Sequence, residues 1–116
     1  MALARGFGNR LLVRTRKRIF IKKFEGTPKR PRGPYSGKLM RVNKWMKIPD
    51  IHNLDLCVVG FHFCKFEHRK HWIGTMLFKV EVRGERYYQQ GRSAKKGLAR
   101  EMRILYQVDP NTGRKL

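Results

Sequence analysis

The fold of this chain is decided by the stretch MLFKVEVRGERYYQQGRSAKKGLAREMRIL, residues 76–105. In residues 76–83 apolar side chains alternate with side chains that are mostly charged, a period that predicts a half-buried antiparallel strand. The apolar members of the alternation are Met76, Phe78, Val80 and Val82. Gly84 and Glu85 predict a tight turn, after which residues 86–90 are expected to return as a further strand.

The second part of this stretch changes to a helical period. Ser93 is a good N-cap residue. Leu98, Met102 and Leu105 follow at spacings of four and three residues, which places them on one face of a helix. The sequence therefore predicts a C-terminal helix over residues 93–107.

Two further elements are expected upstream. Apolar residues spaced by three and four predict a short helix over residues 39–47, which Pro49 ends because proline disfavours helical geometry in the residue before it. Residues 54–66 are rich in β-branched and aromatic side chains and predict a strand with a kink at Gly60. The expected domain, residues 42–116, is thus an α+β fold with a short helix, a three-stranded antiparallel sheet and a C-terminal helix.

Charge is distributed unevenly along the chain. The protein has 116 residues with 28 Lys and Arg against 8 Asp and Glu, a formal net charge of +20. Residues 1–41 hold 13 of the basic residues but one acid, Glu25, and three prolines that interrupt regular structure. We expect residues 1–41 to form an extended basic arm that cannot pack a core alone and that precedes the domain.

This surplus of positive charge makes a polyanion the expected partner, because each phosphate neutralised by Lys or Arg releases a condensed counterion. The 30 Leu, Ile, Val and Phe residues suffice for a small core, whereas no uncharged apolar run approaches the roughly 20 residues of a membrane span. For this reason we expect no membrane partner. We also expect no small-molecule substrate, no cofactor and no homo-oligomer. Two cysteines are too few for a disulfide scaffold and favour a reducing compartment.

Residues 78–96 are expected to form, in this order, a strand, a glycine turn, an aromatic strand and a loop with two lysines. The residues that carry this order are Phe78, Val80, Val82, Gly84, Tyr88, Gly91, Ser93, Lys95 and Lys96. This order resembles the double-stranded-RNA-binding domain family. The resemblance implies the α+β fold given above, with the lysine pair at a helix N-terminus contacting phosphates of duplex RNA. It also implies that a histidine of the loop at residues 67–74 enters a minor groove, and His71 is the nearer equivalent by position.

The candidate RNA-binding residues come from the arm, from this loop and from the expected start of the C-terminal helix. Phosphate contact explains the lysine pair better than a solvated helix start does, given the charge of the whole chain. The full set is Arg14, Arg16, Lys17, Arg18, Lys22, Lys23, Lys29, Arg30, Arg32, His68, Arg69, Lys70, His71, Arg92, Ser93, Lys95 and Lys96.

Metal binding and catalysis are the competing interpretations. Two cysteines and three histidines lie close together in the sequence: Cys57, His62, Cys64, His68 and His71. Their spacing matches no zinc finger or ribbon and contains no C-x-x-C pair, so we expect structural thiols and no metal. The acids are scattered, and the chain has no G-x-S-x-G motif and no Gly-rich phosphate loop, so we expect no enzyme; a ribonuclease using the two loop histidines is the weaker alternative.

A long basic arm on so small a domain resembles the ribosomal proteins. The first 20 residues contain no acid and five arginines, and Leu3, Phe7 and Leu11 share one helical face, as in a mitochondrial transit peptide. We expect a retained arm, with a removable presequence as the alternative. The expected partners are ribosomal RNA and neighbouring ribosomal proteins, in the mitochondrial ribosome or alternatively the cytoplasmic one.

Two other functions stay open at this point. One is an RNA-processing or editing factor that uses the domain as a recruitment module. The other is a basic interaction protein that docks on an acidic partner or an anionic membrane.

Overall fold

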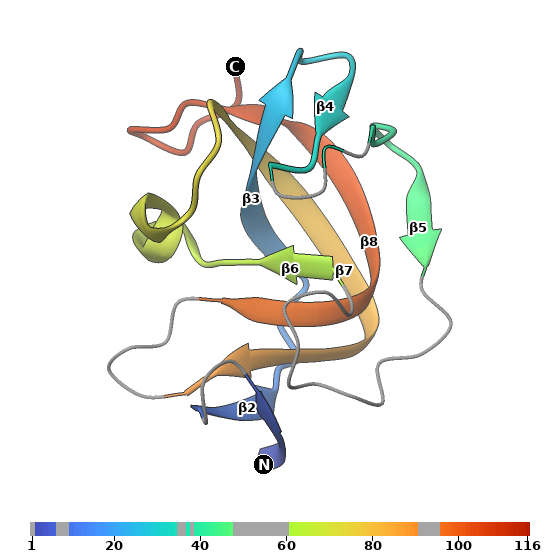
Figure 1. The fold of residues 1–116 in the computed structure, drawn as a ribbon, viewed down its shortest axis with the longest axis vertical. Coiled ribbons are helices and arrows are strands. Elements are labelled where there is room, and N and C mark those ends of the chain that lie inside the picture. Colours follow the sequence, from blue (N-terminus) through green and yellow to red (C-terminus); the bar gives the residue numbers. More distant parts are fainter. Residues whose placement is uncertain (1, 7–9, 35–36, 38, 48–60, 91–95) are drawn as a thin grey trace.

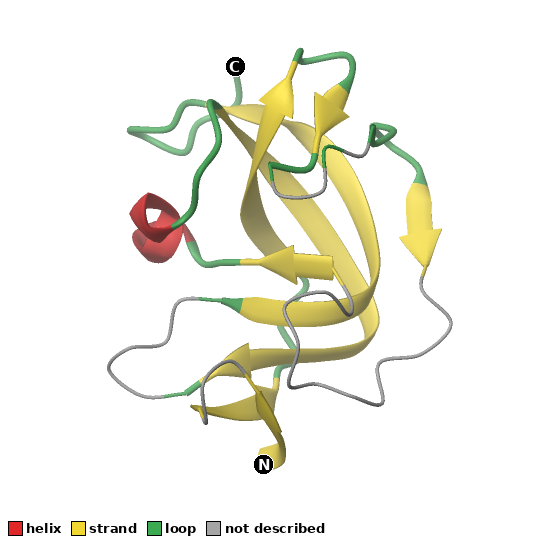
Figure 2. Cartoon of the chain, viewed as in Figure 1, coloured by secondary structure: helices red, strands yellow, loops and turns green. Residues whose placement is uncertain are grey.

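The computed structural model describes residues 2–6, 10–34, 37, 39–47, 61–90 and 96–116 (Figure 1). Within these residues the regular structure is antiparallel β-sheet together with a short 3-10 helix, η1 (Phe66–His71) (Figure 2). The strands are β1 (Ala2–Gly6), β2 (Arg10–Arg14), β3 (Ile19–Gly26), β4 (Pro31–Arg32), β5 (Trp45–Lys47), β6 (Phe61–Phe63), β7 (Met76–Gln89) and β8 (Gly97–Val108). No helix in this part of the chain has the length and apolarity needed to cross a membrane.

The expected α+β fold is therefore wrong. Residues 97–108 form strand β8 where a C-terminal helix was predicted, and residues 45–47 form β5 where the short helix was predicted. The physical reason in β8 is that Met102 and Ile104 are both fully buried with Arg103 between them, a period of two that a sheet satisfies. Pairing with β7 overrides the helical spacing.

The strand predicted over residues 76–83 exists but does not turn back at Gly84. It continues as the single long strand β7, which pairs with β8 along nearly its whole length. The register of the two strands shifts between Arg83 and Arg86, and Gly84 has a φ of 72°, a backbone conformation that glycine adopts without strain. Gly84 therefore marks a bend within the strand, and Figure 1 shows that β7 and β8 both curve strongly along their length. Of the strand predicted over residues 54–66, the structure describes β6 and the residues that follow it.

The sheet curls until two of its edges meet. One edge of β7 pairs with β8, and the other pairs with β2 and β3. The far edge of β8 pairs with β5 and β6. Directly after β6, Cys64 exchanges two backbone hydrogen bonds with Ile21 of β3, at 3.0 and 2.9 Å. This contact joins β6 to β3, so that β3, β7, β8 and β6 surround the interior.

The main core lies on the inner face of this curled sheet. Its buried members are Phe20, Phe24, Phe63, Met76, Phe78, Val80, Val82, Tyr88, Ala99, Met102 and Ile104. A smaller cluster lies on the opposite face, where η1 covers it, and contains Ile21, Cys64, Leu77 and Val108. The two clusters follow from the alternation of side chains along β3 and β7.

Strands from both sides of Arg41 build the sheet. Phe20 and Phe24 of β3 are only 4% and 0% exposed, and β3 pairs with β7 from Ile19 to Phe24. The expected extended arm that packs no core is therefore not what residues 19–26 form. Phe20 and Phe24 are four residues apart, a spacing that places both on the same, inward-facing side of a strand.

Candidate nucleic-acid interface

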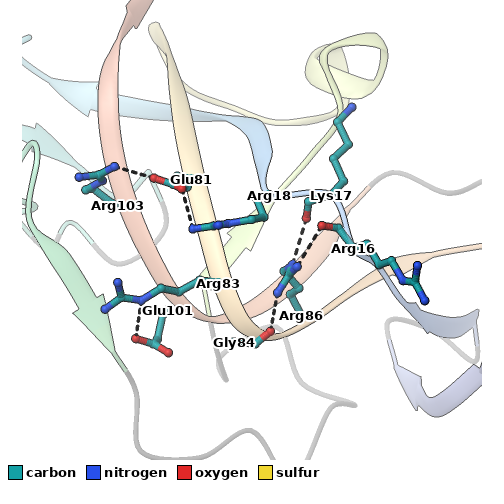
Figure 3. A network of polar contacts seen from close by, with 9 residues as sticks. All are labelled: Arg16, Lys17, Arg18, Glu81, Arg83, Gly84, Arg86, Glu101 and Arg103. Atoms are coloured by element: carbon teal, nitrogen blue, oxygen red, sulfur yellow. Dashed lines mark hydrogen bonds and ion pairs between the residues drawn. The ribbon is translucent and has the colours of Figure 1, made fainter.

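The chain passes from β2 to β3 over the bend of β7 through residues 14–18, a segment that we call the basic crossing. Its sequence is RTRKR, and its four cationic side chains are exposed. Arg86 of β7 fixes the crossing with its guanidinium. This group donates to three backbone oxygens, those of Arg16 (2.9 Å), Lys17 (3.1 Å) and Gly84 (2.8 Å) (Figure 3). The cations of the crossing therefore project from a backbone whose position is set.

Main-chain hydrogen bonds also hold the crossing. The amide of Thr15 donates to the Arg86 oxygen (3.2 Å), and the amide of Val82 donates to the Arg18 oxygen (2.8 Å). Desolvation, followed by the charges of Arg18 and Arg14, lowers the pKa of Arg86. No sequence pattern distinguishes Arg86 from the surface arginines, so its role was not predictable from the sequence.

Carboxylates on the outer face of β7 and β8 neutralise some of the nearby arginines. Glu81 accepts from Arg18 (2.8 Å) and Arg103 (2.6 Å), and Glu101 accepts from Arg83 (3.0 Å) (Figure 3). Arg18, which was predicted to contact RNA, is thus already paired within the protein. The other three cations of the crossing form no ion pair with any residue that the structure describes.

The two histidines that were predicted to contact RNA, His68 and His71, differ in their exposure to solvent. His68 is half-buried, and its Nδ1 lies 2.8 Å from the Tyr88 hydroxyl, which also accepts the Lys65 amide at 2.9 Å. Burial raises the pKa of Tyr88, so the hydroxyl stays protonated and can donate to His68. His71 is exposed, and its ring lies edge-on to that of Trp72 at 5.5 Å. Of the two histidines, His71 is the more exposed to solvent.

Arg69 of η1 fastens the helix to the C-terminal turn. Its Nε donates to the Pro110 oxygen (2.6 Å), its Nη1 donates to the Phe66 oxygen (2.9 Å), and its guanidinium lies 3.8 Å from the centre of the Phe66 ring. These contacts give Arg69 a structural role, and its RNA contact stays a prediction. The next residue, Lys70, is exposed.

The two lysines of β3 lie away from the basic crossing. Lys22 alternates with Phe20 and Phe24, which face the core, and its ammonium donates to the His62 oxygen at 2.6 Å. Desolvation lowers the pKa of Lys22 to about 8. Lys23 is half-buried. Lys22 is thus half-buried, with its ammonium held by a hydrogen bond within the protein.

The remaining predicted cations fall into two groups. Lys29 and Arg30 are exposed at the tip between β3 and β4, which Figure 1 shows far from β2 and the crossing. Arg32, in β4, donates to the Gly37 oxygen (3.1 Å). Lys96 directly precedes strand β8, so the described residues that follow it form a strand and not the predicted helix. The Lys96 ammonium lies 5.4 Å from the centre of the Trp72 ring. The predicted contacts at Arg92, Ser93 and Lys95 lie outside the described residues.

Cys64 and His62 lie close together in the fold but are poorly suited to metal chemistry. Burial raises the pKa of the Cys64 thiol to about 12, and burial followed by the charges of Lys22 and Lys96 lowers the pKa of His62 to about 3. The described residues contain no group of three His, Cys, Asp or Glu side chains that could hold a metal ion. Cys57 lies outside those residues.

The geometry of the described surface leaves the basic crossing, with exposed cations on a fixed backbone, as the best candidate for an interface. Phosphate groups are the ligands that such a surface suits. Comparison of the chain with family models, with curated proteins and with solved structures finds no match.

Proposed function

We propose that this protein is a non-enzymatic RNA-binding component of a ribosome, which holds ribosomal RNA through its phosphates. The observation that carries the proposal is the basic crossing, where Arg14, Arg16 and Lys17 are exposed and form no ion pair within the described part of the chain. Cations fixed in this way attract a phosphate backbone without reading its sequence.

The positions of the acids support the same function. Glu81 and Glu101 are committed to arginines, Glu85 accepts from the Tyr87 hydroxyl (2.5 Å), and Asp109 accepts two amides of its own turn. These carboxylates serve the fold and leave Arg14, Arg16 and Lys17 of the crossing without an ion pair to any described residue. A net charge of +20 on 116 residues then gives a strong positive field that favours a polyanionic partner.

The distance between the cationic groups supports a structural role within a large RNA. The crossing lies beside β2, whereas Lys29 and Arg30 lie at the tip of the β3–β4 turn (Figure 1). Two separated groups contact two segments of RNA, which suits a protein that joins ribosomal RNA helices. The arginine-rich, acid-free first 20 residues support a mitochondrial location.

The first experiment measures binding of a structured ribosomal RNA fragment as a function of salt concentration. We expect the wild-type affinity to fall steeply with salt, and the variant Arg14→Gln/Arg16→Gln to show a shallower slope, by roughly 0.9 for each phosphate that the variant no longer neutralises. Arg41→Gln/Arg114→Gln is the matched control, because both side chains are exposed and the charge removed is the same. Equal slopes for the two variants would contradict an interface at the crossing.

The second experiment tests the ribosomal part of the proposal by sedimentation of the tagged protein from its native source. Co-migration with a ribosomal subunit that disappears after nuclease treatment supports it. Association that survives nuclease digestion would instead indicate an acidic protein partner. Tight binding to any isolated duplex without subunit association would indicate an RNA-processing factor.

A further inference from the structure

A hollow lies next to the basic crossing, between β3, β7 and the start of η1. Lysines from three distant parts of the chain line it: Lys17, Lys65 and Lys79. Apolar residues complete the lining: Ile19, Phe20, Ile21 and Phe66. Figure 3 shows Lys17 reaching from the crossing toward η1, whereas Arg16 points away from it. We call this feature the lysine hollow.

Three lysines border this one hollow, and no carboxylate is among its lining residues. The Lys17 ammonium lies 5.4 Å from the centre of the Phe20 ring, and that of Lys65 lies 4.9 Å from the centre of the Tyr88 ring. These cation–π contacts hold the two side chains in place. Like charges held together repel one another, and an anion placed between them removes the repulsion. The lysine hollow is therefore suited to a phosphate.

The apolar part of the hollow distinguishes a nucleotide from a simple anion. Ile19 is 38% exposed although it is a large apolar side chain, and it lies beside the lysines. Phe66 is half-buried next to it, and the Arg69 guanidinium is stacked on its ring. An inorganic phosphate gains nothing from these surfaces, whereas the sugar and base of a nucleotide bury them.

We infer that the lysine hollow holds one unpaired nucleotide of the bound RNA, with its phosphate on the lysines and its base against Ile19 and Phe66. The inference rests on the proposed function and adds to it a preference for RNA that carries an unpaired nucleotide. An unpaired nucleotide enters the hollow at a lower energetic cost than a paired one, because no base pair has to open. RNA with a single bulged nucleotide is therefore preferred over a continuous duplex.

The test compares the affinity of the protein for two hairpin RNAs of the same sequence, with and without one bulged nucleotide. We expect the wild type to bind the bulged RNA roughly tenfold more tightly, as one stacked base contributes about that much. The variant Lys65→Gln/Lys79→Gln, which leaves the crossing intact, should bind both RNAs equally. Ile19→Ser should also reduce the preference, although it changes no charge.

The matched control is Lys44→Gln/Lys47→Gln, which removes the same charge from exposed positions outside the hollow and should keep the tenfold preference. Equal wild-type affinity for both RNAs would overturn the inference and leave the proposed function standing. Disappearance of the preference in the control would also overturn it, because general charge would then explain the effect. Absence of salt-sensitive RNA binding in the wild type would defeat the proposed function and the inference with it.

A second readout locates the nucleotide directly. In a protein with labelled isoleucine methyl groups, the bulged RNA should shift the signals of Ile19 and Ile21 more than the paired RNA does. Ile104 is fully buried in the main core, so its signal reports whether each variant remains folded. Equal shifts with the two RNAs would contradict a nucleotide in the hollow.

Discussion

Arg86 shows how one residue can join two parts of the fold. In the sequence Arg86 looks like one more surface cation. In the structure its guanidinium donates to backbone oxygens of Arg16, Lys17 and Gly84. Only the planar, many-donor guanidinium can reach all three oxygens at once, whereas a lysine presents a single point of charge. Arg86 therefore stabilises the crossing by geometry and not by charge alone.

Replacement of Arg86 by lysine tests this role. Arg86→Lys keeps the charge but removes the forked hydrogen bonds, so we expect the free energy of unfolding to fall by about 1–2 kcal/mol. Urea unfolding followed by circular dichroism measures the change. Arg16→Lys is the control, because the Arg16 side chain is exposed and should leave the midpoint unchanged. Equal midpoints for both variants would show that the Arg86 hydrogen bonds contribute little.

His62 makes the stability depend on pH. Burial, followed by the charges of Lys22 and Lys96, lowers the pKa of His62 from 6.5 to about 3. Between these values the unfolded chain binds a proton that the folded protein does not, so stability is lost as the pH falls from 6.5 toward 3. His62→Gln removes this titration, and the variant should lose less stability than the wild type between pH 7 and pH 4. Urea unfolding at both pH values measures the difference, and an equal loss in both proteins would contradict the role of His62.

At the scale of elements, the sequence predicted the strand at residues 76–83 because its alternation is local. It could not predict that β8 is a strand, since Leu98, Met102 and Leu105 also fit a helical face. The partners that decide between the two lie elsewhere in the chain, in β7 and β6. The turn predicted at Gly84 failed for the same reason, because pairing on both edges of β7 carries the strand through the bend.

The candidate site was predictable only in part. The cations of the basic crossing could be named as RNA-binding candidates because their charge is visible in the sequence. The structure leaves three of them exposed and without an ion pair to any described residue. Lys65 and Lys79 of the lysine hollow were missed, since nothing local shows that strands β3 and β7 bring them next to Lys17. His68 and Arg69 were overvalued, because their hydrogen bonds to Tyr88 and Pro110 depend on tertiary structure.

A cross-strand charge exchange tests the pairing of β7 with β8. Arg83 and Glu101 are direct partners in the register and form an ion pair at 3.0 Å. Arg83→Glu should lower the free energy of unfolding by up to about 1 kcal/mol, because it places two acids opposite each other near the surface. Adding Glu101→Arg should restore much of the loss. Additive losses in the double variant, measured by urea unfolding, would contradict the register.

At the scale of the whole molecule, strand β3 of the basic N-terminal segment is part of the core. Phe20 and Phe24 pack against residues of β6 and β7, and β3 supplies the contact at which the curled sheet meets itself. The charge that suggested a separate arm and the side chains that complete the core thus occupy the same segment.

Truncation of the chain distinguishes a separate basic arm from a segment that completes the core. Removal of residues 1–26 deletes β3, and we expect the remaining chain to lose cooperative unfolding and methyl signal dispersion, because two fully packed phenylalanines are removed. Removal of residues 1–9 is the control, since it leaves β2 to β8 in place and should preserve a cooperative transition. A fragment that starts at residue 27 and still unfolds cooperatively would contradict the arrangement.

The hydrogen bonds from Arg86 to the backbone of residues 14–18 restrict the length of this segment more strictly than its composition. Its exposed side chains can be exchanged with little effect on the interior. An added or deleted residue would instead shift β3 against β7 by one position and turn Phe20 and Phe24 outward, since side chains alternate between the two faces of a sheet. The fold alone therefore fixes the number of residues in this segment, whereas the requirement for phosphate binding fixes their charge.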